Sequence, residues 1–248
     1  MFDTLCAIGL TLSASIVAAF LAHAMARTWA GRVTAAGLLA LWFVVVLALG
    51  AGGALDPVRG IGVQGLGLTV ALPVAALIAA FFAVRAVRDA MMATPLPALV
   101  AVNAIRTLPG AMFVLLYAAG RLPAPFAPSA GWGDIFAGLA ALPLAWAILR
   151  FGSGVRAPAF LWNAIGIADL VTAIGLGALS APGPLQLFAG PPTSAIMTSL
   201  PWLIIPGFIV PSLIVIHVVI FYRLAKSEAS APARSSLNNG AARGSVSV

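Results

Sequence analysis

An arginine and an aspartate stand inside apolar stretches of this sequence, where charged side chains are costly. Arg106 occurs in VNAIRTLPG and Asp169 in WNAIGIADL, and each follows an asparagine, Asn103 or Asn163. An unpaired charge in mid-bilayer costs about 2.5–3.5 kcal/mol on insertion scales, whereas arginine and a carboxylate neutralise each other through paired hydrogen bonds. We therefore predict that Arg106 pairs with Asp169 and that these four residues form a polar binding site. A water-filled cavity that solvates each charge separately is the alternative.

Helix geometry supports this pairing. If both stretches enter the membrane from the same side, a rise of about 1.5 Å per residue puts Arg106 roughly 14 Å deep and Asp169 roughly 18 Å deep. The difference is within the reach of an arginine side chain. The two asparagines lie at equal depths of roughly 9 Å, although only Asn103 shares a helix face with its charged neighbour. Asn163 is free to serve a different helix.

The two histidines, His23 and His217, suggest a different chemistry. They lie at similar depths in the first and last apolar segments, so two imidazoles on neighbouring helices could ligate one b-type haem or a metal. The alternative is two rings near the membrane interface, hydrogen-bonded to backbone or headgroups, with no cofactor. We expect no cofactor. The single cysteine, Cys6, excludes an intramolecular disulfide.

Residue patterns that would indicate an enzyme are missing from the sequence. The only lysine is Lys226, beyond the last apolar segment, and no glutamate precedes Glu228. The chain contains no HExxH, no nucleophile elbow, no P-loop and no glycine-rich dinucleotide turn. The sequence therefore favours a function other than catalysis.

The composition is that of a membrane protein. Of the 248 residues, 62% are hydrophobic and 8% are charged, against about 25% charged in soluble domains. Apolar segments long enough to cross a hydrocarbon core of roughly 30 Å recur along the chain. We predict an all-α polytopic bundle of seven transmembrane helices in residues 1–222, followed by a disordered cytoplasmic tail, 223–248. The expected spans are 4–26, 33–54, 65–84, 97–119, 134–150, 157–180 and 196–222.

The basic residues indicate an orientation. Eight lie near the spans on one side of the predicted bundle and two on the other. By the positive-inside rule, the N-terminus is outside and the C-terminus is cytoplasmic. The same rule explains the net charge of +7 without invoking nucleic acid. The eight are Arg27, Arg32, Arg85, Arg88, Arg150, Arg156, Arg223 and Lys226; the two are Arg59 and Arg121.

Prolines and an aspartate stand near the outer ends of the fifth and the last predicted spans. Asp134 follows a connection rich in Pro and Gly, and we expect it to cap the start of the fifth span through backbone N–H groups. Pro201, Pro206 and Pro211 interrupt the last span and free backbone carbonyls. Such carbonyls line binding sites in some transporters, although plain kinking is common in membrane helices.

Residues 100–222 resemble a group of uncharacterised bacterial integral membrane proteins. The resemblance rests on VNAIRTLPG, AGWGD and WNAIGIADL, which contain the patterns N-x-x-R and WN-x₅-D. It implies a multi-pass protein of the bacterial cytoplasmic membrane and adds weight to the polar positions, but it implies no activity.

Three functions follow as hypotheses. The first is a protein that binds, transports or senses a small solute at Arg106, Asp169, Asn103 and Asn163. The second is a membrane haem or redox protein that uses His23 and His217. The third is a structural or assembly subunit of the membrane without a ligand. The expected partners are the lipid bilayer and a small solute but no nucleic acid, and a homo-oligomer is left open.

Overall fold

The computed structural model describes residues 1–229, and every regular element in this part of the chain is a helix. The long helices are apolar along most of their length, as the composition predicts. In chain order the elements are α1 (Phe2–Met25), α2 (Trp29–Ala51), α3 (Gly62–Ala83), α4 (Arg85–Ala93), α5 (Leu96–Ala101), η1 (Val102–Arg106), α6 (Thr107–Ala118), α7 (Ala127–Phe151), η2 (Gly152–Val155), α8 (Arg156–Leu179), η3 (Ser194–Thr198), η4 (Ile205–Ile209) and α9 (Val210–Ala229).

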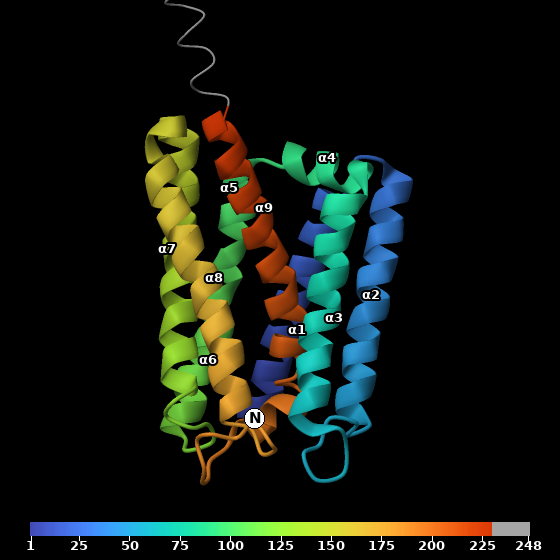
Figure 1. The fold of residues 1–248 in the computed structure, drawn as a ribbon, viewed down its shortest axis with the longest axis vertical. Coiled ribbons are helices and arrows are strands. Elements are labelled where there is room, and N and C mark those ends of the chain that lie inside the picture. The colour runs from blue at the N-terminus through green and yellow to red at the C-terminus, as the bar shows by residue number, and fades with distance from the viewer. Residues whose placement is uncertain (230–248) are drawn as a thin grey trace, which may run out of the picture.

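Six helical stretches of the described chain are long and apolar enough to cross a membrane. One of them, Ala127–Leu179, is 53 residues long and contains both α7 and α8, which turn back on each other at η2 and lie side by side (Figure 1). The all-helical class is confirmed, with six to seven long apolar helices. The predicted bounds of the first three spans and of the sixth agree with the observed helices to within a few residues.

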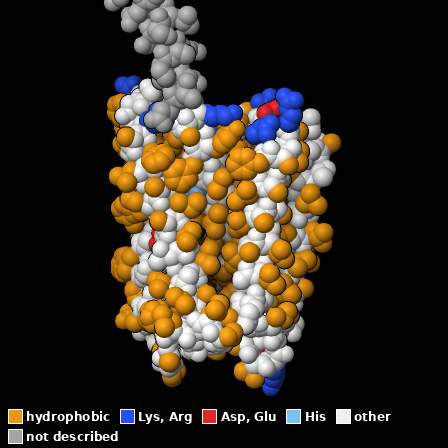
Figure 2. All heavy atoms as spheres, in the orientation of Figure 1, with side chains coloured by type: hydrophobic (Ala, Val, Ile, Leu, Met, Phe, Trp, Pro, Cys, Tyr) orange, Lys and Arg blue, Asp and Glu red, His pale blue; other side chains and the backbone are white. Residues whose placement is uncertain are grey.

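Most of the visible charged side chains gather at the two ends of the bundle, and most basic ones gather at one of them (Figure 2). We call this the α4 end, because α4 lies across it (Figure 1). The opposite end, where Met1 lies, is the N-terminal end. The α4 segment was expected to be a simple connection, but RAVRDAMMA is rich in good helix formers and buries Ala90 and Met91 while its charges face outward.

The last helix is the most enclosed of the long helices. In the most apolar 18-residue stretch of Ile205–Lys226, 78% of the residues are buried inside the protein. The same share is 11% in Trp29–Ala51 and in Gly62–Ala83. Helix α9 packs against α3, α8 and η4, so its apolar residues face neighbours on several sides. An apolar helix surrounded in this way brings any polar side chain on it into the protein interior.

Two of the predicted spans are broken where proline interrupts them. The fourth, Leu96–Ala118, contains a 3₁₀ segment at Val102–Arg106, just before Pro109, which cannot donate to the carbonyl of Ile105. The last span begins later than expected: residues 200–203 are turns, and a π-helical turn precedes α9. Mid-helix 3₁₀ and π segments often occur at functional sites.

The boundary between bundle and tail differs from the prediction. Helix α9 continues to Ala229, seven residues beyond the predicted end at 222. The expected disorder of the remaining tail lies outside the described residues.

Candidate functional site

Arg106 is the centre of a buried polar cluster. It ends η1, and its side chain is fully enclosed. Its Nε donates to Oδ1 of Asp134 on α7 at 2.7 Å, and Nη2 donates to Oδ2 of Asp169 on α8 at 2.5 Å. Nη1 donates to the carbonyl of Gly166 at 3.1 Å. The predicted contact of Arg106 with Asp169 is confirmed, and a second carboxylate joins it.

A histidine and an asparagine extend the cluster to α9. Nη1 of Arg106 lies 3.2 Å from Nε2 of His217, and Nδ1 of that ring lies 2.7 Å from Oδ1 of Asn163. A guanidinium can only donate, so Nε2 must accept and the neutral ring carries its proton on Nδ1, which donates to Asn163. The amide of Asn163 in turn donates to the backbone carbonyl of His217 at 3.0 Å. We call Arg106, Asp134, Asp169, Asn163 and His217 the Arg106 cluster.

The charges of the Arg106 cluster do not balance. One guanidinium, which stays protonated in proteins, faces two carboxylates. When both are ionised, the cluster carries one excess negative charge, which a proton or another cation must offset because lone charges in low dielectric are costly. Within the described residues, Oδ2 of Asp134 and Oδ1 of Asp169 accept no hydrogen bond from a polar group. Of these two aspartates, only Asp134 also lines the neighbouring cavity.

The guanidinium itself has little capacity left for a ligand. Four of its five N–H groups are directed at Asp134, Asp169, Gly166 and His217. An anionic solute would have to displace one of the carboxylates to reach Arg106. The cluster is therefore suited to cations or protons and unsuited to anions.

Glycines make room for the cluster. A Cβ on Gly133 would lie 1.7 Å from Oδ1 of Asp169, and one on Gly166 would lie 2.6 Å from Cε1 of His217. Both distances are shorter than any real contact, so larger residues would push these polar side chains away from Arg106. The sequence pattern AGWGD thus supplies both the carboxylate of Asp134 and the space for its partner on α8.

A second pair of glycines sets the distance between α6 and α7. A Cβ on Gly110 would lie 2.7 Å from the carbonyl oxygen of Gly131, and one on Gly138 would lie 2.4 Å from Oγ1 of Thr107. Small residues at such crossings let two helix backbones approach closely in a membrane. This close approach places Asp134, between the glycines of α7, beside Arg106.

The prediction for Asp134 was wrong. It was expected to cap a helix beginning at residue 134, but α7 begins at Ala127, so Asp134 lies two turns inside the helix and is buried. Pro128, in the first turn of α7, is at a position where its missing N–H costs nothing. The sequence AGWGD contained a signal for the additional site residue, since an aspartate within a small-residue segment can approach a neighbouring helix.

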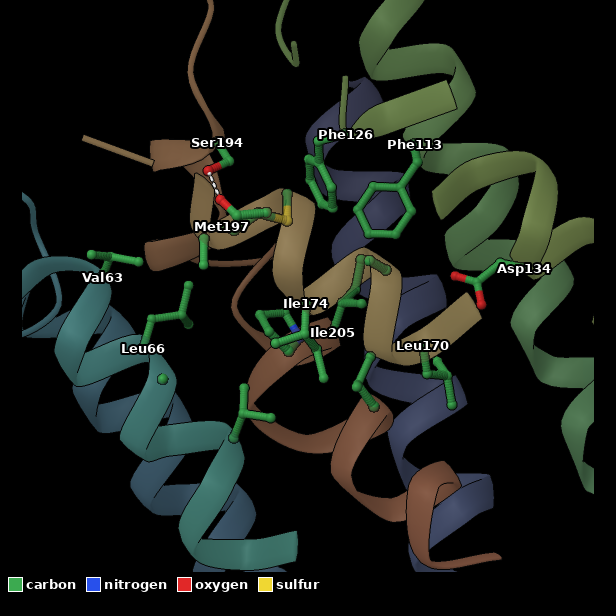
Figure 3. A pocket seen from close by; sticks show the side chains of 17 residues that line it. Val63, Leu66, Phe113, Phe126, Asp134, Leu170, Ile174, Ser194, Met197 and Ile205 are labelled. Carbon is green, nitrogen blue, oxygen red and sulfur yellow. Dashed lines mark hydrogen bonds between the residues drawn. The ribbon is translucent and has the colours of Figure 1, made fainter. Parts of the chain in front are cut away.

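A cavity of about 80 Å³ lies between α3, α6, α8 and the start of the last span. Figure 3 shows the carboxylate of Asp134 at one side of it and Val63 and Leu66 at the other. Asp134 is the one charged side chain among the described residues that line it. Phe126 and Ser194, which belong to the N-terminal end, also contribute to the wall, so the cavity extends from that end toward the Arg106 cluster.

Asn103 and His23, which were proposed from sequence, make no hydrogen bond to the Arg106 cluster. The side-chain amide of Asn103 donates to the carbonyls of Leu99 and Val100, and its Oδ1 is buried with no partner in the described chain. His23 is exposed on α1. The structure therefore brings Arg106, Asp169 and Asn163 together but gives Asn103 only a local role in its own helix.

The haem alternative does not fit this geometry. Both ring nitrogens of His217 already have partners, Asn163 and Arg106, and a haem iron would have to displace one of them. Within residues 1–229, no group of three or more His, Cys, Asp or Glu residues is arranged to hold a metal ion.

One comparison with known proteins gives a match. A family model described as a domain of unknown function (DUF8737) matches residues 63–225, which include every residue of the Arg106 cluster and exclude α1 and α2. No curated protein and no solved structure matches the chain.

Proposed function

We propose that this chain, which belongs to the DUF8737 family of unknown function, is a multi-pass membrane protein that binds a small cationic solute at the Arg106 cluster and transports or senses it. Seven spans, with the N-terminus outside, would place the cavity on the outer side and the α4 end in the cytoplasm. The eight-to-two bias of basic residues supports this orientation. The resemblance to bacterial proteins supports a bacterial cytoplasmic membrane.

The observation that carries the proposal is a buried cluster of two carboxylates and one guanidinium beside an apolar cavity. Ionisable residues within membrane helices are expensive and mark functional sites by default. Asp134 belongs to both features, since it pairs with Arg106 and lines the cavity. A solute with a short apolar body and a positive group would place the body in the cavity and the charge near the free carboxylate oxygens.

The size of the cavity restricts the solute. Pockets for drug-sized ligands measure about 300–1,000 Å³, whereas this cavity holds about 80 Å³. A small alkylammonium ion fits this limit better than a large drug-like cation. Phe113 and Phe126, packed edge to face with centroids 5.3 Å apart, line the same cavity, and aromatic rings attract cations.

Thermal stability of the purified protein tests the proposal. We expect methylammonium and ethylammonium to raise the melting temperature of the wild type, whereas acetate and propionate at equal ionic strength do not. Asp134→Asn should abolish the effect. Asp56→Asn removes the same charge in an exposed connection and serves as the matched control. Equal stabilisation of both variants by the cations would refute a site at Asp134.

A structural subunit without a ligand is the second candidate. Full enclosure of Arg106, with four N–H groups bonded internally, favours it. This role predicts that no solute of either charge changes the melting temperature and that a properly folded variant with an apolar cluster supports cell growth as well as the wild type does.

A further inference from the structure

Helices α2 and α3 follow each other in the chain but leave a groove between them. Helix α2 packs on α1 and η4, whereas α3 packs on α4, α9, η3 and η4 (Figure 1). Between them lies a cavity of about 920 Å³, bounded at the α4 end by Arg27, Thr28 and Asp89. It lies apart from the Arg106 cluster and does not depend on the function proposed there.

The walls of this groove are largely apolar between α2 and α3. Leu38 and Leu39 of α2 face Leu72, Ala76 and Leu77 of α3 across it. A further cavity of about 330 Å³ continues it toward the N-terminal end and shares Trp42, Leu72 and Pro73 with it. A long apolar groove that begins at one end of the bundle matches the shape of a lipid acyl chain.

The mouth of the groove is basic. Arg27 lines it. Three further arginines lie in the adjoining parts of α2 and α4, namely Arg32, Arg85 and Arg88. Asp89 is the one acidic residue of these segments. Figure 2 shows this gathering of basic side chains around a carboxylate at the α4 end.

The donors of Arg27 are largely free. Among the bonds of the described residues, it makes one, from Nη2 to the backbone carbonyl of Asp89 at 3.2 Å. The N-terminus of α2, capped by Thr28, lies at the same mouth and adds the positive end of a helix dipole. Four arginines beside one aspartate favour an anionic group, and basic pockets between membrane helices bind anionic lipid headgroups.

We infer that this groove binds one anionic phospholipid from the leaflet at the α4 end. The phosphate lies near Arg27 and the N-terminus of α2, and an acyl chain lies between α2 and α3. The family match begins at residue 63, so α2 and Arg27, which form half of this groove, lie outside the matched segment.

Lipid retention tests the inference. The protein is reconstituted into bilayers of phosphatidylglycerol and phosphatidylcholine at a ratio of about 1:4, extracted in mild detergent, and its retained lipid is measured by mass spectrometry. We expect wild-type protein to be enriched in phosphatidylglycerol over the bilayer ratio. Arg27→Gln should lower this enrichment about fivefold, which corresponds to about 1 kcal/mol for a basic residue near an anionic headgroup.

Two further variants separate a groove from a general charge effect. Ala76→Phe fills the groove without changing its charge and should lower the retention of phosphatidylglycerol. Arg150→Gln removes one charge at the same end but on α7, away from the groove, and should leave retention unchanged. Retention in the bilayer ratio by the wild type, or an equal loss in Arg150→Gln, would overturn the inference. So would efficient crosslinking of two copies through Thr34→Cys, which would make the groove a contact between chains.

Discussion

Removal of Arg106 should destabilise this protein more than removal of either of its aspartates. Arg106→Leu leaves two carboxylates facing each other in the interior with no positive charge. Asp169→Asn or Asp134→Asn leaves one carboxylate paired with Arg106, so no carboxylate is left without a positive partner. The structure therefore predicts an asymmetry, which a simple pair of Arg106 with Asp169 would not show.

The expected losses of stability follow from the unpaired groups that each variant leaves in the interior. Breaking a buried pair by removing one partner costs about 3–5 kcal/mol, and Arg106→Leu breaks two pairs, so we expect at least the upper part of this range. Loss of a hydrogen bond to a charged group costs about 1.5–3 kcal/mol, which is the expectation for Asp134→Asn. Asp169→Asn should lower the free energy of unfolding less than Asp134→Asn does, because the side chain of Asp169 is 13% exposed and that of Asp134 is 7% exposed.

The assay is reversible unfolding in mixed micelles with increasing sodium dodecyl sulfate, followed by circular dichroism. Arg106→Leu combined with Asp169→Asn should cost less than the sum of the two single changes, because one stranded carboxylate is removed; couplings of about 0.5–3 kcal/mol are typical of contacting residues. Additive losses, or a smaller cost for Arg106→Leu than for Asp169→Asn, would refute the geometry of the cluster.

Three further outcomes are expected. Gly133→Ala should destabilise the protein by about 1–3 kcal/mol through overpacking against the cluster, whereas Gly37→Ala, which has open space around it, should not; equal effects in the same unfolding assay would contradict this. With the native cysteine removed, cysteines at Ser153 and Ser129 should label only from the cytoplasm and only from outside, respectively, and the reverse pattern would invert the orientation. The pKa of Asp56 is lowered by hydrogen bonds from the backbone N–H groups of Arg59 and Val58, so the turn should be ordered above the ordinary aspartate pKa and loosen as pH falls through the lowered value; NMR shifts of those two amides measure it.

Much of the helical framework could be predicted because its causes are local. A run of about 20 apolar residues favours a membrane helix wherever it occurs, since its backbone groups must be satisfied within the segment. The first three predicted spans therefore lie close to α1, α2 and α3. The last span was misplaced because prolines at 201, 206 and 211 allow several helix starts, and neighbouring helices choose among them.

The Arg106 cluster was predicted in part. The pairing of Arg106 with Asp169 follows from opposite charges at similar depth, and depth is a property of position along a helix. Asp134 was missed because its role depends on where α7 begins, and that start was predicted seven residues too late. His217 was considered only as a haem ligand or as a ring near the membrane interface, because nothing in sequence spacing shows which helices become neighbours.

The sequence by itself determined that the chain forms long apolar helices and that charges within them need partners, because the cost of placing charge or bare backbone in an apolar medium depends on residue type. Only the tertiary structure decided which partners those are. Glycines at 110, 131, 133, 138 and 166 set how closely the helices that carry the cluster approach, because a Cβ at each would lie less than 3 Å from an atom of a neighbouring segment. The meeting of two carboxylates with one guanidinium beside a cavity is a property of that packing.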